Sequence, residues 1–98
     1  MEVSAYRVPT DAPEADGTIQ WDHTTLVLVE LEAGGERGLG FSYSSEATAR
    51  LLGGMLAHLA KDQAALAPAA LQGRLDRAVR NVGRPGIASH AISAIDVA

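Results

Sequence analysis

The segment Thr24–Glu32, with the sequence TTLVLVELE, decides the fold of this 98-residue chain. Its β-branched and apolar residues predict a β-strand, with Val27 and Val29 on one face and Leu26 and Leu28 on the other. Because both faces are apolar, the strand needs cover on both sides, and a chain of this length easily covers only one.

The residues after this segment predict a strand that returns antiparallel to it. Gly34-Gly35 is a tight-turn signal, and the returning strand is expected over residues 36–43. Gly38 and Gly40 share one face of that strand, which leaves the face bare and suits the close approach of another backbone. These glycines match no phosphate-binding motif, because no Lys-Ser/Thr pair follows them and no helix starts there.

The residues before the central strand predict a short strand and a long loop. Val3–Val8 is the expected first strand, and it should end at Pro9 because proline lacks the backbone N–H of a ladder. Thr10–Asp22 is expected to be a loop, since it holds Pro13, Gly17 and four acidic residues. Three strands are therefore expected, of which the last two pair antiparallel.

Alanine and leucine at helical spacing dominate the chain after residue 44. Three helices are expected: one capped by Ser44 or Ser45, one from Pro68 to Gly83, and one that begins near Ile87. The predicted inner faces are Ala47, Leu51, Met55 and Leu59 in the first helix, and Leu71, Leu75, Ala78 and Val82 in the second. The third helix is apolar nearly all round, so we expect it to be buried on every side or to pair with a surface outside this chain. Because strands come first and helices follow, the expected fold class is α+β, in one domain over residues 1–98.

Composition excludes several classes of function. The net charge of −4 argues against a nucleic-acid-binding domain, which normally carries a basic surface. The absence of cysteine excludes disulfides, zinc knuckles and thiol nucleophiles. No stretch resembles a signal peptide or a membrane span, so we expect a cytoplasmic protein with no membrane partner.

Few side chains are candidates for chemistry. His23, His58 and His90 are too far apart in sequence to suggest a metal site, and no Gly-x-Ser-x-Gly elbow occurs. Trp21 and Asp22 directly precede the central strand and Tyr43 ends its neighbour, so they are expected near one edge of the sheet, as packing or as ligand contacts. One stripe of the second helix, which we interpret as a solvated face or as a contact for an acidic partner, holds Arg74, Arg77, Arg80 and Arg84.

Five segments occur in an order that is typical of one family. They are residues 15–21, residues 24–30, GLGFSY at residues 38–43, RNVGRPG at residues 80–86 and AISAIDVA at residues 91–98. Together they resemble the N-terminal capping domain of the enolase superfamily, in the mandelate racemase and muconate lactonizing enzyme branch. The family's catalytic residues and the acidic ligands of its Mg²⁺ belong to a (β/α)₈ barrel that we expect this chain to lack, so none is assigned here.

The resemblance implies a three-stranded antiparallel meander followed by a three-helix bundle. It also implies a lid for an enzyme that abstracts the proton next to a carboxylate in a hydroxy acid or acid sugar. Two segments would close over the barrel, about Thr10–His23 and Ser42–Ser45. The implied substrate-binding residues are Trp21, Asp22 and Tyr43, with Ile19 and His23 behind them. No catalytic residue, metal ligand or cofactor is expected within the chain, which alone should be inactive.

The alternative is a free-standing interaction module without enzymatic activity. In that case the chain would self-associate through the third helix and the exposed face of the sheet. In the lid interpretation, its partner is the barrel domain.

Overall fold

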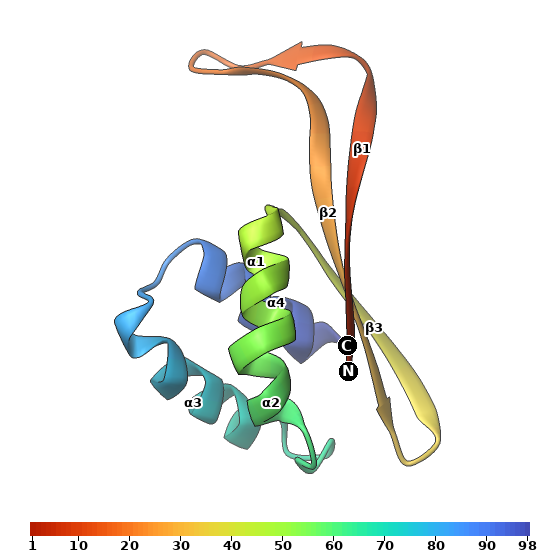
Figure 1. The fold of residues 1–98 in the computed structure, drawn as a ribbon, viewed down its shortest axis with the longest axis vertical. Coiled ribbons are helices and arrows are strands. Elements are labelled where there is room, and N and C mark those ends of the chain that lie inside the picture. The colour runs from red at the N-terminus through yellow and green to blue at the C-terminus, as the bar shows by residue number, and fades with distance from the viewer.

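The computed structural model describes residues 1–98 as an antiparallel sheet with helices packed against one face (Figure 1). The strands are β1 (Glu2–Ala15), β2 (Gln20–Ala33) and β3 (Glu36–Ser44), in the order β1-β2-β3. Gly34 and Gly35 form the turn between β2 and β3 with φ angles of 61° and 83°, which side chains rarely allow. The predicted meander is confirmed.

Three helices follow the sheet, as predicted. The first is continuous through α1 (Glu46–Leu51), a π-helical turn η1 (Leu52–Leu56) and α2 (Ala57–Ala60). The second is α3 (Pro68–Ala78), which tightens into the 3₁₀ turn η2 (Val79–Asn81), and the third is α4 (Ile87–Val97). None of these helices combines the length and the apolar character that crossing a membrane requires.

The predicted loop over residues 10–22 is wrong, because both strands continue into it. β1 passes Pro9 and reaches Ala15, and the register with β2 shifts between Pro9 and Glu14. β1 is an edge strand, which is the position in a sheet where proline is tolerated. The result is a long hairpin whose tip bends toward the side where α1 begins (Figure 1).

The bare glycine face of β3 receives another backbone, as predicted. A Cβ at Gly40 would collide with the carbonyl of Ala94, and one at Gly38 with the carbonyl of Ala98. The end of α4 therefore lies directly on β3, closer than any side chain on these two residues would permit.

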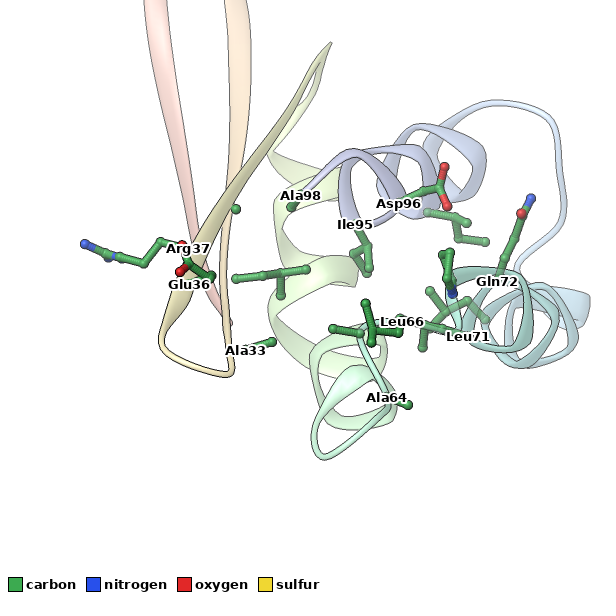
Figure 2. A pocket seen from close by; sticks show the side chains of 16 residues that line it. Ala33, Glu36, Arg37, Ala64, Leu66, Leu71, Gln72, Ile95, Asp96 and Ala98 are labelled. Carbon is green, nitrogen blue, oxygen red and sulfur yellow. The ribbon is translucent and has the colours of Figure 1, made fainter.

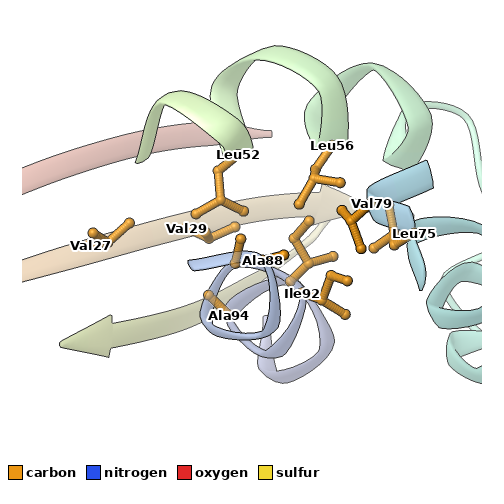
Figure 3. Close-up of a cluster of buried hydrophobic side chains, with 11 residues drawn as sticks. Val27, Val29, Leu52, Leu56, Leu75, Val79, Ala88, Ile92 and Ala94 are labelled. Carbon is orange, nitrogen blue, oxygen red and sulfur yellow. The ribbon is translucent and has the colours of Figure 1, made fainter. Parts of the chain in front are cut away.

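The core lies between the sheet and the helices (Figure 3). It consists of Val27, Val29, Leu52, Leu56, Leu75, Val79, Ala88, Ala91, Ile92, Ala94 and Ile95. The predicted inner face of the first helix is wrong by one residue: Thr48, Leu52 and Leu56 are buried, whereas Met55 is 42% exposed. In the second helix Leu75 is buried as expected, but Val79 takes the place predicted for Val82, which is exposed.

The third helix is not buried on every side. Its apolar stripe of Ala88, Ala91, Ile92, Ala94 and Ile95 is covered by the chain's own sheet and helices, while His90, Ser93, Asp96 and Val97 are exposed. The expectation that this helix needs an outside partner for its apolar side is therefore wrong. The uncovered apolar residues lie instead on the outer face of the sheet, where Leu39, Phe41 and Tyr43 are each more than half exposed.

Candidate functional site

The tip of the β1–β2 hairpin is held by one carboxylate. Asp16 Oδ1 accepts hydrogen bonds from the Thr18 hydroxyl (2.7 Å), the Thr18 backbone N–H (2.7 Å) and the Ile19 backbone N–H (2.9 Å). These bonds lower the pKa of Asp16 because they stabilise its ionised form, and the Thr18 hydroxyl contributes most. The Asp16 carboxylate therefore serves the local turn.

Trp21 and Tyr43 meet in an open concavity of about 590 Å³ at the bend of the hairpin. The Trp21 indole Nε1–H donates to Glu14 Oε2 (3.1 Å), and these two residues are also paired across the strands. The other residues that line the concavity are Val8, Pro9, Thr10, Asp11, Thr24 and Leu26. This hollow has an apolar floor and two carboxylates near it.

Asp22 and His23 belong to a different cluster. His23 Nδ1 lies 2.7 Å from Asp22 Oδ1 and 3.2 Å from Arg7 Nη2. An Nδ1–H that donates to Asp22 has no lone pair to offer Arg7, so the charge partner of the Arg7 guanidinium is the Asp22 carboxylate, with Nη2 4.0 Å from Oδ1. The hydrogen bond with His23, together with the charges of His23 and Arg7, lowers the pKa of Asp22.

This second cluster borders a smaller concavity on the helix side of the sheet. It measures about 320 Å³ and is lined by Ala5, Tyr6, Arg7, His23, Thr25 and Glu46. Period-two alternation along the strand separates His23 from the hollow that holds Tyr43. Ile19, the remaining predicted site residue, is 62% exposed at the tip and lines neither concavity.

A hydrogen-bond chain that the sequence does not reveal holds the end of β3. His90 Nδ1 lies 2.8 Å from Ser44 Oγ, which lies 2.6 Å from Thr48 Oγ1. The chain ties α4, β3 and α1 together next to Tyr43. Ser45 occupies the N-cap position of α1, but its side chain makes no capping hydrogen bond. No local pattern could have found a contact between residues 46 positions apart.

The acidic side chains at the tip do not form a metal site. Glu14, Asp16 and Asp22 each bond to a different neighbour, and no group of three or more His, Cys, Asp or Glu side chains is placed to hold a metal ion. The residues of this chain therefore do not fit a magnesium ion. The geometry supports packing and hydrogen bonding to a ligand.

The four arginines expected on one stripe of the second helix lie on the surface, but Arg84 lies beyond that helix, in the turn before α4. Arg74 donates to Gln63 (2.8 Å) and Arg84 donates to Asp76 (2.6 Å), while the side chains of Arg77 and Arg80 are also exposed. This agrees with the interpretation of a solvated, partly salt-bridged face.

Comparisons of sequence and of structure give different results. No protein-family model matches the chain, and no curated protein is significantly similar to it. Solved structures, in contrast, match almost all of it. A mandelate racemase/muconate lactonizing enzyme-like protein from Rubrobacter xylanophilus is 50% identical, with a TM-score of 0.93 over 97% of this chain.

Two further structures extend the likeness. A racemase from Streptomyces coelicolor A3(2) with bound magnesium is 26% identical, with a TM-score of 0.92 over 97% of this chain. L-Talarate dehydratase from Polaromonas sp. JS666, complexed with Mg and L-glucarate, is 29% identical, with a TM-score of 0.78 over 98%. The chain spans only 26%, 28% and 28% of these three proteins, respectively.

Proposed function

We propose that this chain, a capping domain of the mandelate racemase/muconate lactonizing enzyme branch of the enolase superfamily, is the lid of a magnesium-dependent enzyme. Its substrate would be a hydroxy acid or an acid sugar. The observation that carries the proposal is that Trp21 and Tyr43, from different strands, line one concavity at the hairpin bend. The chain would contribute binding and specificity, and a barrel domain would contribute the chemistry.

The concavity suits the hydroxylated part of such a substrate. Val8, Leu26 and the two aromatic rings offer an apolar floor. The carboxylates of Asp11 and Glu14 can accept hydrogen bonds from hydroxyl groups, whereas they repel another carboxylate. A hydroxy acid would therefore bind with its hydroxyl groups toward the lid and its carboxylate away from it.

The lid would also exclude water from the reaction. Magnesium chemistry would be supplied by the barrel domain, and the residues of this chain would only bind the substrate and keep water away. Closure of the hairpin tip over the substrate would strengthen the electrostatic interactions beneath it. Trp21 would pack on the substrate. Its hydrogen bond to Glu14 would orient the Glu14 carboxylate, which would accept a hydrogen bond from a substrate hydroxyl.

A chimera tests this function. The corresponding segment of the Rubrobacter xylanophilus protein would be replaced by this chain, and magnesium-dependent turnover measured on a panel of hydroxy acids and acid sugars. Trp21→Ala and Tyr43→Ala should each lower kcat/KM at least tenfold and change the order of preferred substrates. Val82→Ala, at an exposed position of the helical layer, is the matched control and should change neither.

The result that contradicts the proposal is equally specific. A folded, active chimera whose rate and substrate order do not respond to Trp21→Ala or Tyr43→Ala would show that the concavity does not face substrate.

A further inference from the structure

Two hydroxyl groups in this chain are buried without a hydrogen-bond partner. They belong to Thr10, in β1, and to Ser45, directly before α1. Folded proteins satisfy nearly all of their buried polar groups, so each exception requires an explanation. Ser45 lines neither of the two concavities beside the hairpin, whereas Thr10 lines the one that holds Trp21 and Tyr43. The Thr10 hydroxyl is therefore the one that a ligand in this concavity could satisfy.

An irregular pairing places Thr10 at the concavity. Between the cross-strand pairs that Pro9 and Glu14 make, β1 has four residues where β2 has one. In a regular strand, neighbouring side chains point to opposite faces, but inserted residues break this alternation. Thr10 and Asp11, which are neighbours in sequence, can therefore line the same concavity.

One rotation brings the hydroxyl within reach of a ligand. Thr10 is partly exposed, although its hydroxyl oxygen is not. The three substituents on the threonine Cβ occupy staggered positions, so a rotation of about 120° moves the hydroxyl out of its buried position. The methyl group or the hydrogen that takes its place needs no hydrogen-bond partner there. A ligand that accepts a hydrogen bond from Thr10 would therefore remove the cost of an unpaired buried hydroxyl.

We propose that Thr10 is a specificity-determining residue of the lid, and that its hydroxyl donates a hydrogen bond to a hydroxyl oxygen of the substrate. This inference rests on the proposed lid function. The ionised carboxylates of Asp11 and Glu14 can only accept hydrogen bonds, and the Trp21 indole N–H is already donated to Glu14. Thr10 adds a donor beside these acceptors. Two neighbouring substrate hydroxyl groups suit this arrangement, because one can donate to a carboxylate while the other accepts from Thr10.

The apolar hollow between α3, the end of α4 and the loop at Leu66 carries no such proposal (Figure 2). It measures about 420 Å³, and Glu36, Arg37 and Asp96 give its rim mixed charge. Nothing in the structure selects one occupant for it.

The stability of the 98-residue chain tests whether the Thr10 hydroxyl lacks a partner. Thr10→Val keeps the shape of the side chain and removes the hydroxyl, so it should raise the midpoint of thermal unfolding by about 4 °C. Thr25→Val, the same change on the helix side of the sheet, is the control and should shift the midpoint by less than about 2 °C. A midpoint that stays or falls in Thr10→Val would show that the hydroxyl is already satisfied, and would overturn the proposal.

Substrate analogues in the chimera test the contact itself. An acid sugar with two neighbouring hydroxyl groups remote from its carboxylate would be compared with two deoxy analogues, each of which lacks one of these groups. Thr10→Val should lower kcat/KM for the complete substrate about tenfold, mainly by raising KM. For the analogue that lacks the accepting hydroxyl, the same substitution should change kcat/KM less than about twofold. Thr10→Ser keeps the donor and should stay within about threefold of the unsubstituted chimera on every substrate.

The same chimera separates the role of Thr10 from the lid function. If Trp21→Ala and Tyr43→Ala change the substrate order but Thr10→Val acts equally on all three substrates or on none, the lid function stands and the role of Thr10 is refuted. A Thr10→Ser variant as impaired as Thr10→Val would also refute it, because the hydroxyl would then not be the group that matters. If Trp21→Ala and Tyr43→Ala have no effect in an active chimera, the lid function fails and this proposal fails with it.

Discussion

The carbonyl oxygen of Ala94 occupies the space where a side chain at Gly40 would begin. The end of α4 packs on β3 through backbone atoms, with no layer of side chains between them. Gly40→Ala should therefore force the helix from the sheet and destabilise the fold by about 3 kcal/mol, the upper range for overpacking.

Gly53→Ala is the control for this change, since nothing lies within 4 Å of a Cβ at Gly53. In a helix interior alanine is favoured over glycine by about 1 kcal/mol, so this variant should be stabilised. Urea denaturation of both variants checks the pair. Equal effects would contradict the close packing of α4 on β3.

The buried face of the first helix predicts a second contrast. Leu52 is fully buried, whereas Met55 is 42% exposed on the same helix. Leu52→Ala should cost about 3 kcal/mol through lost burial and the cavity it leaves, and Met55→Ala should cost less than about 1 kcal/mol. Thermal unfolding of the two variants measures the difference, and the reverse order would place the helix in the other register.

The stability of the hairpin tip should depend on pH because the ionised Asp16 carboxylate holds the turn. Its pKa is lowered in the folded chain, so its contribution to stability is fully present above its ordinary value of 3.8 and is lost as pH falls through the lower folded value. The Thr18 amide resonance should therefore titrate below pH 3.8. In Asp16→Asn that titration should disappear, whereas Asp11→Asn should leave it unchanged. A Thr18 amide that titrates above pH 3.8 would contradict this bonding.

The chain of hydrogen bonds from α4 to α1 predicts a smaller effect. His90→Ala removes the contact with Ser44 but leaves Ser44 bonded to Thr48, so it should cost about 1 kcal/mol. Ser93→Ala, at an exposed position of the same helix, should change stability by less than about 0.5 kcal/mol. Chemical denaturation measures the free energy of unfolding of both variants. If the two substitutions cost the same, the His90–Ser44 contact does not stabilise the fold.

The strand order and the number of helices were predictable because the turn glycines and the change of composition near residue 44 are local signals. The helix register was not. Two rows, Ala47-Leu51-Met55 and Thr48-Leu52-Leu56, both recur at steps of four, and hydrophobicity favours the first because it lacks a hydroxyl. The structure selects the second, since Ser44 satisfies the Thr48 hydroxyl and allows it to be buried.

The candidate site was predictable only in part. The antiparallel register places Trp21 and Tyr43 at one end of the sheet, as expected. Prolines and acidic residues suggested a loop where the hairpin continues. The alternation of side chains along β2, which places His23 on the helix side of the sheet, was therefore missed. The contact of His90 with Ser44 depends on how α4 lies on β3, which only the folded chain defines.

The register shift between Pro9 and Glu14 is a point in β1 about which the rest of the hairpin, up to its tip, can tilt. At ~3.3 Å per residue the tip lies about 20 Å beyond this point. A tilt of about 10° at the shift would displace the tip by about 3.5 Å, which is more than the ~2.8 Å diameter of a water molecule. A small rotation at this irregular pairing would therefore move the hairpin tip far enough to admit or exclude a water molecule.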